Sequence, residues 1–184
     1  MNPLQPRIAA VLVLAYPKQG EPHIVLTKRS ETVADHKGQI SLPGGAWEKD
    51  DADLEVTALR EAEEEVGVRG ADIRVLGRLE DVYVPVSNFL IAPYVGVLHY
   101  APSFRPDPFE VAHVIEVPIQ GLRRPEIYQE GEWLLRGRRR WVRYYQCGPH
   151  QIWGATARVV QLFLESELSE STVRFFEGNP PSSS

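Results

Sequence analysis

The sequence has a single cysteine, no long apolar run and no excess of positive charge. Cys147 stands alone among 184 residues, so no disulfide can form within the chain, and no Cys/His cluster has zinc-site spacing. A formal net charge of −5 argues against general nucleic-acid binding. The apolar run at residues 8–16 is too short to span a membrane and lacks the basic segment that precedes the apolar region of a signal peptide. We therefore expect a cytoplasmic protein with no membrane or nucleic-acid partner.

The remaining composition is that of an ordinary folded domain. Hydrophobic residues make up 43% of the chain and charged residues 24%, and the length suffices for one sizeable core. We find no internal repeat, long linker or second domain. The sequence predicts one domain over residues 1–178 and a disordered Asn-Pro-Pro-Ser-Ser-Ser tail over residues 179–184.

Strands and helices are predicted in mixed order, which favours an α+β fold of the α/β/α sandwich type over a doubly wound parallel sheet. Apolar residues at helical spacing predict helices over residues 54–66 and 151–168. Asp51 or Asp53 is suited to cap the first helix and Gly67 to end it. Aliphatic and β-branched runs between turn residues predict strands over residues 8–16, 23–29, 39–42, 73–84, 89–100 and 111–118, and a hairpin over 132–136 and 140–146.

Three carboxylates on the first predicted helix are its most informative feature. Glu61, Glu64 and Glu65 are spaced i, i+3, i+4 and so project from one face, where their like charges repel. A divalent cation between them would remove this cost, and all-oxygen ligation suits Mg²⁺ or Mn²⁺. Arg60 is placed to orient a carboxylate by charge-assisted hydrogen bonds. The alternative is an exposed acidic face whose charges are solvated.

A Pro43-Gly44-Gly45 turn precedes this helix. Glycine allows the backbone to approach a ligand closely, so a free carbonyl or N–H of this turn could join the same site.

The segment from the glycine turn to the end of the helix resembles the signature of the Nudix hydrolases; it reads GGAWEKDDADLEVTALREAEEEVGV. Its second half matches that signature at Arg60, Glu61, Glu64, Glu65, Gly67 and Val68. Its first half departs from it, because Ala52 stands eight residues before Arg60, where the family has a glutamate. The nearest acid is Asp51, which must take over the role of that glutamate if any residue does.

The same offset occurs in one branch of the family, the coenzyme A diphosphatases. That branch carries a second motif upstream, to which three segments of this chain are similar: Leu26-Thr27-Lys28-Arg29-Ser30, His36-Lys37-Gly38 and Leu42-Pro43-Gly44-Gly45. Leu42 replaces the phenylalanine usual in the branch, and Ala34 stands where a basic residue is often found.

The resemblance implies a Nudix fold with a mixed sheet, a catalytic loop-helix-loop and hydrolysis of coenzyme A or a derivative with Mg²⁺ or Mn²⁺. It implies that Glu61, Glu64 and Glu65 hold the metal together with the Gly45 carbonyl, and that Glu61 or Glu65 contacts the attacking water. By the branch motif, Lys28, Arg29, Ser30, His36 and Gly44 are predicted to bind substrate. Arg60, Glu61 and Glu65 are predicted to be catalytic. Glu110 follows a proline-rich loop and is either a further catalytic carboxylate or an ordinary surface residue.

Two other functions stay open on the sequence alone. The chain could hydrolyse another nucleoside diphosphate derivative, such as ADP-ribose or NADH, or it could be a non-catalytic module that senses a ligand. If the chain hydrolyses coenzyme A or another nucleoside diphosphate derivative, its partner is a small-molecule substrate. A homodimer is expected by family analogy only. The basic residues 136–143 either read the 3′-phosphate of coenzyme A or form a solvated hairpin tip.

Overall fold

A computed structural model describes residues 5–30, 38–135 and 137–178. Its centre is β1 (Arg7–Lys18), which pairs in parallel with β7 and antiparallel with β2. β1 is apolar on both faces because both faces are covered. Leu12 and Leu14 pack in the cluster that holds α1, whereas Val13 and Ala15 pack in the cluster that holds α3.

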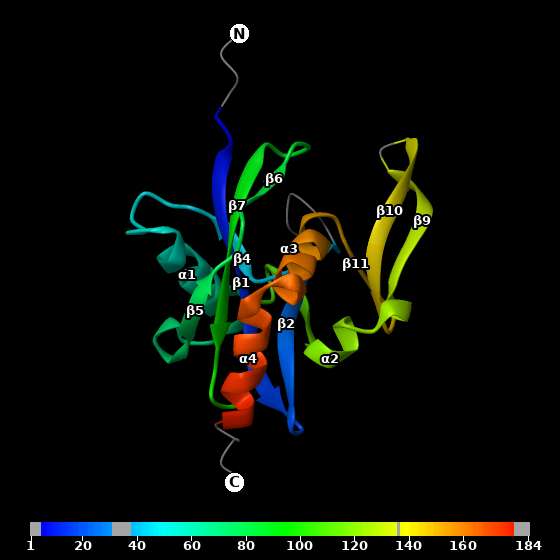
Figure 1. Ribbon diagram of the computed structural model, residues 1–184. Helices are drawn as coiled ribbons and strands as arrows, with labels where there is room; N and C mark the ends of the chain where they lie inside the picture. Colours follow the sequence, from blue (N-terminus) through cyan, green and yellow to red (C-terminus); the bar gives the residue numbers. More distant parts are fainter. Residues whose placement is uncertain (1–4, 31–37, 136, 179–184) are drawn as a thin grey trace.

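The main sheet is mixed and lies between helices, as the sequence predicts for an α/β/α sandwich (Figure 1). Helix α1 (Leu54–Val66) covers one face, and α3 (Gly154–Glu165) with α4 (Glu167–Gly178) covers the other. The central strand order is β3 (Ile40–Ser41), β2 (Glu21–Arg29), β1, β7 (Phe89–Val97) and β5 (Arg74–Arg78), while β4 (Gly44–Ala46) pairs with β1, β6 (Val82–Val84) with β7, and β8 (Val111–Pro118) with β2.

The first predicted helix begins and ends where the sequence indicates. Asp53 is the N-cap, since its Oδ1 accepts a hydrogen bond of 2.9 Å from the N–H of Val56. Gly67 is the left-handed C-cap, and its N–H donates to the carbonyl of Glu63. Ala58, Ala62 and Val66 form the buried stripe against the sheet. Because this stripe faces the sheet, the register of the helix fixes the directions in which Glu61, Glu64 and Glu65 project.

The second predicted helix is wrong at both ends. Residues 151–153 belong to β11 (His150–Trp153), which pairs with β10, and α3 starts only at Gly154. The helix then stops at Ser166, whose ψ of 157° is extended, and α4 follows. Pairing with a neighbouring strand has overridden the local helical spacing of residues 151–153, and the amphipathic pattern of α4 was not recognised in the sequence.

Other differences concern lengths and small elements. The strand predicted over residues 73–84 is two strands, β5 and β6, which pair with different parts of β7. The predicted hairpin is longer and joins β11 in a second sheet, β11-β10-β9, made with β9 (Tyr128–Leu135) and β10 (Arg138–Cys147). Figure 1 shows this hairpin beside the main sheet, on the side away from α1. The short helix α2 (Ile119–Leu122) and the 3₁₀ turns η1 (Gly70–Asp72) and η2 (Pro125–Ile127) were not predicted.

Three predictions concern residues outside the described ranges. They are the tail over residues 179–184, His36 in the segment 31–37, and Arg136 of the basic cluster. Within the described ranges, no helix has the length and apolar character needed to cross a membrane.

Candidate active site

Three segments meet beside the carboxyl-terminal half of α1. They are the glycine turn at β4, the end of β2 and the loop that leads into β8. The N–H of Asp107 in that loop donates to the carbonyl of Glu65 at 3.2 Å, and the N–H of Ser30 donates to the carbonyl of Glu110 at 2.8 Å. Backbone hydrogen bonds therefore hold Glu110 and the end of β2 next to the acidic helix.

The glycine turn lies in close contact with both β1 and the acidic helix. A Cβ at Gly44 would lie 2.4 Å from the carbonyl oxygen of Ala10, and Gly44 has a positive φ of 155°. A Cβ at Gly45 would lie 2.4 Å from the carboxylate of Glu61. The first glycine is thus required by backbone packing, and the second leaves room for a side chain of the candidate site.

Arg60 organises the acidic face. Its Nε and Nη2 donate to Oδ1 and Oδ2 of Asp51 at 2.9 and 3.0 Å, and its Nη1 donates to Glu61 Oε1 at 2.9 Å and Glu64 Oε2 at 3.0 Å. The Asp51 carboxylate also accepts hydrogen bonds from the N–H of Glu48 and the hydroxyl of Thr57. The hydrogen bonds from Arg60 hold the pKa of Asp51 far below its ordinary value.

This network gives Asp51 a role, although a glutamate is missing from the usual position. The carboxylate is buried and accepts one hydrogen bond on Oδ1 and three on Oδ2, so it serves as the anchor of Arg60.

Glu65 is the most unusual group of the site. Its side chain is only 3% exposed, and its Oε1 lies 3.7 Å from Nη1 of Arg29. Burial raises the pKa of Glu65 to about 8, and the negative charges of Glu61 and Glu110 act in the same direction. Arg29 and the amide of Gly44 oppose the shift without cancelling it.

Two buried atoms at this pair have no hydrogen-bond partner among the described residues: Oε2 of Glu65 and Nε of Arg29. Leaving such atoms unpaired is costly, so each indicates a group that the described residues do not supply. A cation satisfies the carboxylate oxygen, and an anion such as phosphate satisfies the guanidinium nitrogen.

The predicted trio of metal ligands does not converge as a set. Within residues 5–30, 38–135 and 137–178, no three acidic, histidine or cysteine side chains form a group that could hold a metal ion. Arg60 engages both Glu61 and Glu64, and Glu64 is 59% exposed. Glu61 is partly buried, and burial raises its pKa. The oxygen-only donor set and the unpaired Oε2 of Glu65 still fit a divalent cation, with Glu61 and Glu65 as the better placed carboxylates.

The other predicted residues divide into two groups. Ser30 is buried, and its hydroxyl donates to the carbonyl of Phe109 at 2.7 Å, so this side chain holds the Glu110 loop, and its contact with substrate stays a prediction. Glu110 itself is exposed, but it is near enough to influence the pKa of Glu61 and Glu65. Lys28 pairs across the sheet with His113, one position before Arg29. By strand alternation its side chain points to the opposite face from that of Arg29.

The turn that carries Glu110 was not predicted from the sequence. The Asp107 side chain accepts a hydrogen bond of 2.9 Å from the N–H of Phe109, and its carbonyl accepts from the N–H groups of Glu110 and Val111. Asp followed by Pro is a recognisable turn signal and could have identified it. The basic residues of the β9–β10 hairpin lie apart from this site, and Arg139 and Arg143 pair with Glu132 and Glu130.

Comparison with known proteins identifies the family. The profile of the NUDIX domain matches residues 6–163. The chain is 37% identical to a protein named uncharacterized Nudix hydrolase NudL from Photorhabdus laumondii, over 84% of this chain and 81% of that one. It is 35% identical to Nudix hydrolase 22, chloroplastic, from Arabidopsis thaliana, over 85% of this chain and 54% of the plant protein. The match to the solved structure of a MutT/nudix family protein from Enterococcus faecalis covers 89% of this chain and 62% of that chain, with a TM-score of 0.61 at 15% sequence identity.

Proposed function

This chain belongs to the NUDIX domain family, whose hydrolases act on diphosphate bonds with the help of divalent metal ions, and we propose that its substrate is coenzyme A or a coenzyme A derivative. In the proposed reaction, water attacks the diphosphate and the products are 4′-phosphopantetheine, or its acyl form, and adenosine 3′,5′-bisphosphate.

The observation that carries this proposal is the contact between Arg29 and Glu65. Arg29 belongs to the segment Leu26–Ser30 that resembles the coenzyme A branch, and Glu65 belongs to the acidic helix common to the whole family. Their side chains lie 3.7 Å apart, beside the Gly44–Gly45 turn, and each has one buried atom that pairs with none of the residues the structure describes. The branch-specific residues thus adjoin the candidate metal carboxylates, where a diphosphate has to bind.

The roles of the residues follow from this arrangement. When bound, a divalent cation, Mg²⁺ or Mn²⁺, neutralises diphosphate charge and lowers the pKa of a water molecule. Glu61 and Glu65 would hold it, and the Gly45 carbonyl stays a predicted ligand. Within the described part of the chain, Nε of Arg29 has no acceptor and could donate to a phosphate oxygen, and Arg60 fixes the Glu61 carboxylate. Burial raises the pKa of Glu65 to about 8, and a cation bound there would favour the charged form of this carboxylate.

The test is product analysis with purified protein and Mg²⁺ or Mn²⁺. We expect adenosine 3′,5′-bisphosphate to be released from coenzyme A, with little or no turnover of ADP-ribose or NADH. Equal activity on ADP-ribose and coenzyme A would favour a broader nucleoside diphosphate hydrolase, and no release of the bisphosphate would contradict the proposal.

Glu65→Gln is the variant that should lose hydrolytic activity without a change of fold. It keeps the volume of the side chain and removes the charge, so hydrolysis should fall by orders of magnitude while the far-ultraviolet circular dichroism stays the same. Glu63→Gln is the control, because Glu63 lies on the same helix but is exposed, and its side chain accepts a hydrogen bond from the N–H of Gly70.

A further inference from the structure

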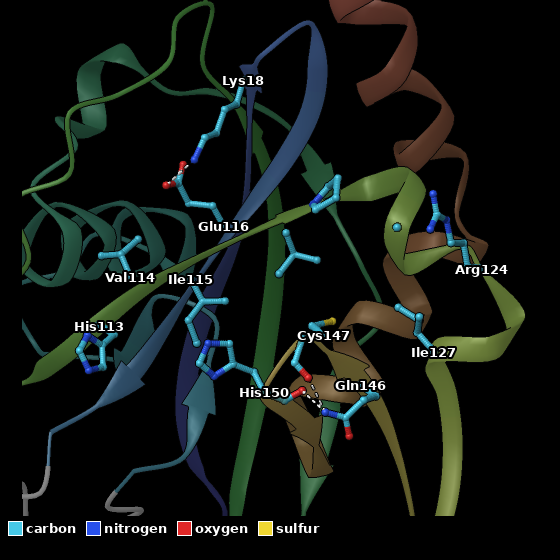
Figure 2. A pocket seen from close by; sticks show the side chains of 14 residues that line it. Lys18, His113, Val114, Ile115, Glu116, Arg124, Ile127, Gln146, Cys147 and His150 are labelled. Atoms are coloured by element: carbon cyan, nitrogen blue, oxygen red, sulfur yellow. Dashed lines mark hydrogen bonds and ion pairs between the residues drawn. The ribbon is translucent and has the colours of Figure 1, made fainter.

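A groove of about 770 Å³ runs along β8 at the edge of the main sheet (Figure 2). All residues from His113 to Pro118 line it. In Figure 2, Arg124 and Ile127 lie on the side of the segment that follows α2, and Gln146, Cys147 and His150 lie on the side of the β10–β11 turn. The groove is therefore walled on two sides and floored by the strand.

The floor of this groove is an open strand edge. β8 pairs antiparallel with β2 from His23 opposite Pro118 to Arg29 opposite Val111. No other strand pairs with β8 in the part of the chain that the structure describes. Along an unpaired edge every second residue points its N–H and C=O groups outwards, which makes the edge a template for another extended chain with amide groups.

The strand that floors the groove begins next to residues of the candidate active site. Glu110 immediately precedes β8, and Arg29, the neighbour of Glu65, is opposite its first residue, Val111. His113, which lines the groove, is directly opposite Lys28, so the two side chains share one face of the sheet. Arg29 and Glu65 lie on the other face of the sheet, so an extended group attached to a diphosphate there would have to pass round the open edge of β8 to enter the groove at His113.

The chemistry of the groove suits a mildly polar, extended arm. Its walls combine apolar side chains with an amide, because Ile115 and Ile127 lie near Gln146. The charge of Lys18 is already compensated by Glu116 at 2.8 Å. At about 3.3 Å per residue, the strand from His113 to Pro118 spans about 17 Å.

We propose that the edge of β8 binds the pantetheine arm of the substrate as an additional extended strand. This inference rests on the proposed function. The arm carries two secondary amides in a flexible, extended chain, and these can pair with outward-pointing N–H and C=O groups of the edge. Discrimination in favour of coenzyme A over ADP-ribose then comes from the groove, and the carboxylates of α1 serve the diphosphate.

Hydrogen–deuterium exchange with the two products separates this inference from the proposed function. Excess 4′-phosphopantetheine should slow exchange in the peptide that contains residues 111–118, and adenosine 3′,5′-bisphosphate should not. If coenzyme A is hydrolysed but neither product changes exchange in β8, the groove does not hold the arm and the inference is wrong. If exchange in β8 depends on protein concentration and not on 4′-phosphopantetheine, the edge pairs with a second copy of the chain, which also overturns it. No hydrolysis of coenzyme A would overturn both.

A groove-filling variant gives a kinetic test. Arg124 is exposed, so Arg124→Trp should fold normally and narrow the groove. We expect the KM for coenzyme A to rise about tenfold, which corresponds to about 1.4 kcal/mol, while inhibition by adenosine 3′,5′-bisphosphate stays the same. Arg174→Trp, an equally exposed change on α4, is the matched control. An unchanged KM in Arg124→Trp would count against the proposal.

Discussion

Two hydrogen bonds join the guanidinium of Arg60 to the carboxylate of Asp51, from Nε to Oδ1 at 2.9 Å and from Nη2 to Oδ2 at 3.0 Å. The carboxylate is buried, and the third nitrogen of Arg60 reaches Glu61 and Glu64. The acid that precedes the helix thus acts on the site through Arg60. This explains how the chain keeps an ordered acidic face although Ala52 occupies the usual glutamate position.

Asp51→Ala should therefore damage both stability and activity. It leaves a partly buried guanidinium without its main partner, which costs about 3 kcal/mol or more of the free energy of unfolding. It also frees Arg60 and misplaces Glu61, so hydrolysis should fall about a hundredfold. Urea denaturation and turnover of the substrate at a temperature where the variant is folded measure the two effects separately.

Adding Ala52→Glu to Asp51→Ala tests whether spacing alone matters. Residue 52 is exposed, so a glutamate there points to solvent and should not restore stability. Full rescue by the second change would show that any nearby acid can anchor Arg60, contrary to the geometry described above.

The helix and its carboxylates could be predicted because their signals are local. The cap at Asp53, the Gly67 terminus and the apolar stripe all lie within residues 53–67. The role of Ser30 could not be predicted, since its partner Phe109 is 79 residues away and only the pairing of β2 with β8 brings the two together. The boundary of α3 was missed for the same reason, because β11 exists only through its pairing with β10. Long-range pairing decides these features, and single-sequence periodicity does not contain it.

The two glycines of the turn should respond differently to alanine. At Gly45 the added Cβ meets the flexible end of Glu61, so the side chain can move away at a stability cost below about 1 kcal/mol, while activity falls because that carboxylate is displaced. At Gly44 the Cβ meets backbone atoms of Ala10 and Val11 at a positive φ, which should destabilise the fold by about 3 kcal/mol or more. Thermal unfolding and turnover of both variants provide the comparison.

Gly131→Ala is the control for this pair. Its nearest neighbour would be at an ordinary 3.5 Å, so both stability and activity should stay close to those of the parent protein. A Gly45→Ala variant with full activity would mean that Glu61 is not needed where it lies.

Ser30 is expected to act through Glu110. Its hydroxyl and its N–H hold the carbonyls of Phe109 and Glu110, so Ser30→Ala should loosen this loop and lower kcat. If Glu110 is the group that Ser30 positions, adding Ser30→Ala to Glu110→Gln should cause little further loss. A double-mutant cycle on kcat measures this coupling, and Ser30→Thr, which keeps the hydroxyl, should restore part of the activity. Independent, additive losses would show that Ser30 serves another purpose.

The raised pKa of Glu65 makes stability depend on pH in a definite direction. Between an ordinary value of 4.5 and about 8, the folded protein binds a proton at Glu65 that the unfolded chain has already released. Stability therefore decreases as pH rises through this window, by an amount on the order of a few kcal/mol, and levels off above it. Glu65→Gln has no proton to lose, so this variant should lack that decrease and be more stable than the parent protein at pH 8, with little difference at pH 5.

Denaturant unfolding at several pH values, in the presence of a chelator, measures the effect. The exposed neighbour variant Glu64→Gln should keep the pH dependence of the parent protein, because the carboxylate it loses is 59% exposed and not the buried one. Mg²⁺ or Mn²⁺ should then raise the melting temperature of the parent protein at pH 8, where the cation replaces the proton on Glu65, and do so less for Glu65→Gln. Identical pH profiles for the parent protein and Glu65→Gln would show that this carboxylate already ionises in the folded protein at low pH, and that burial does not control it.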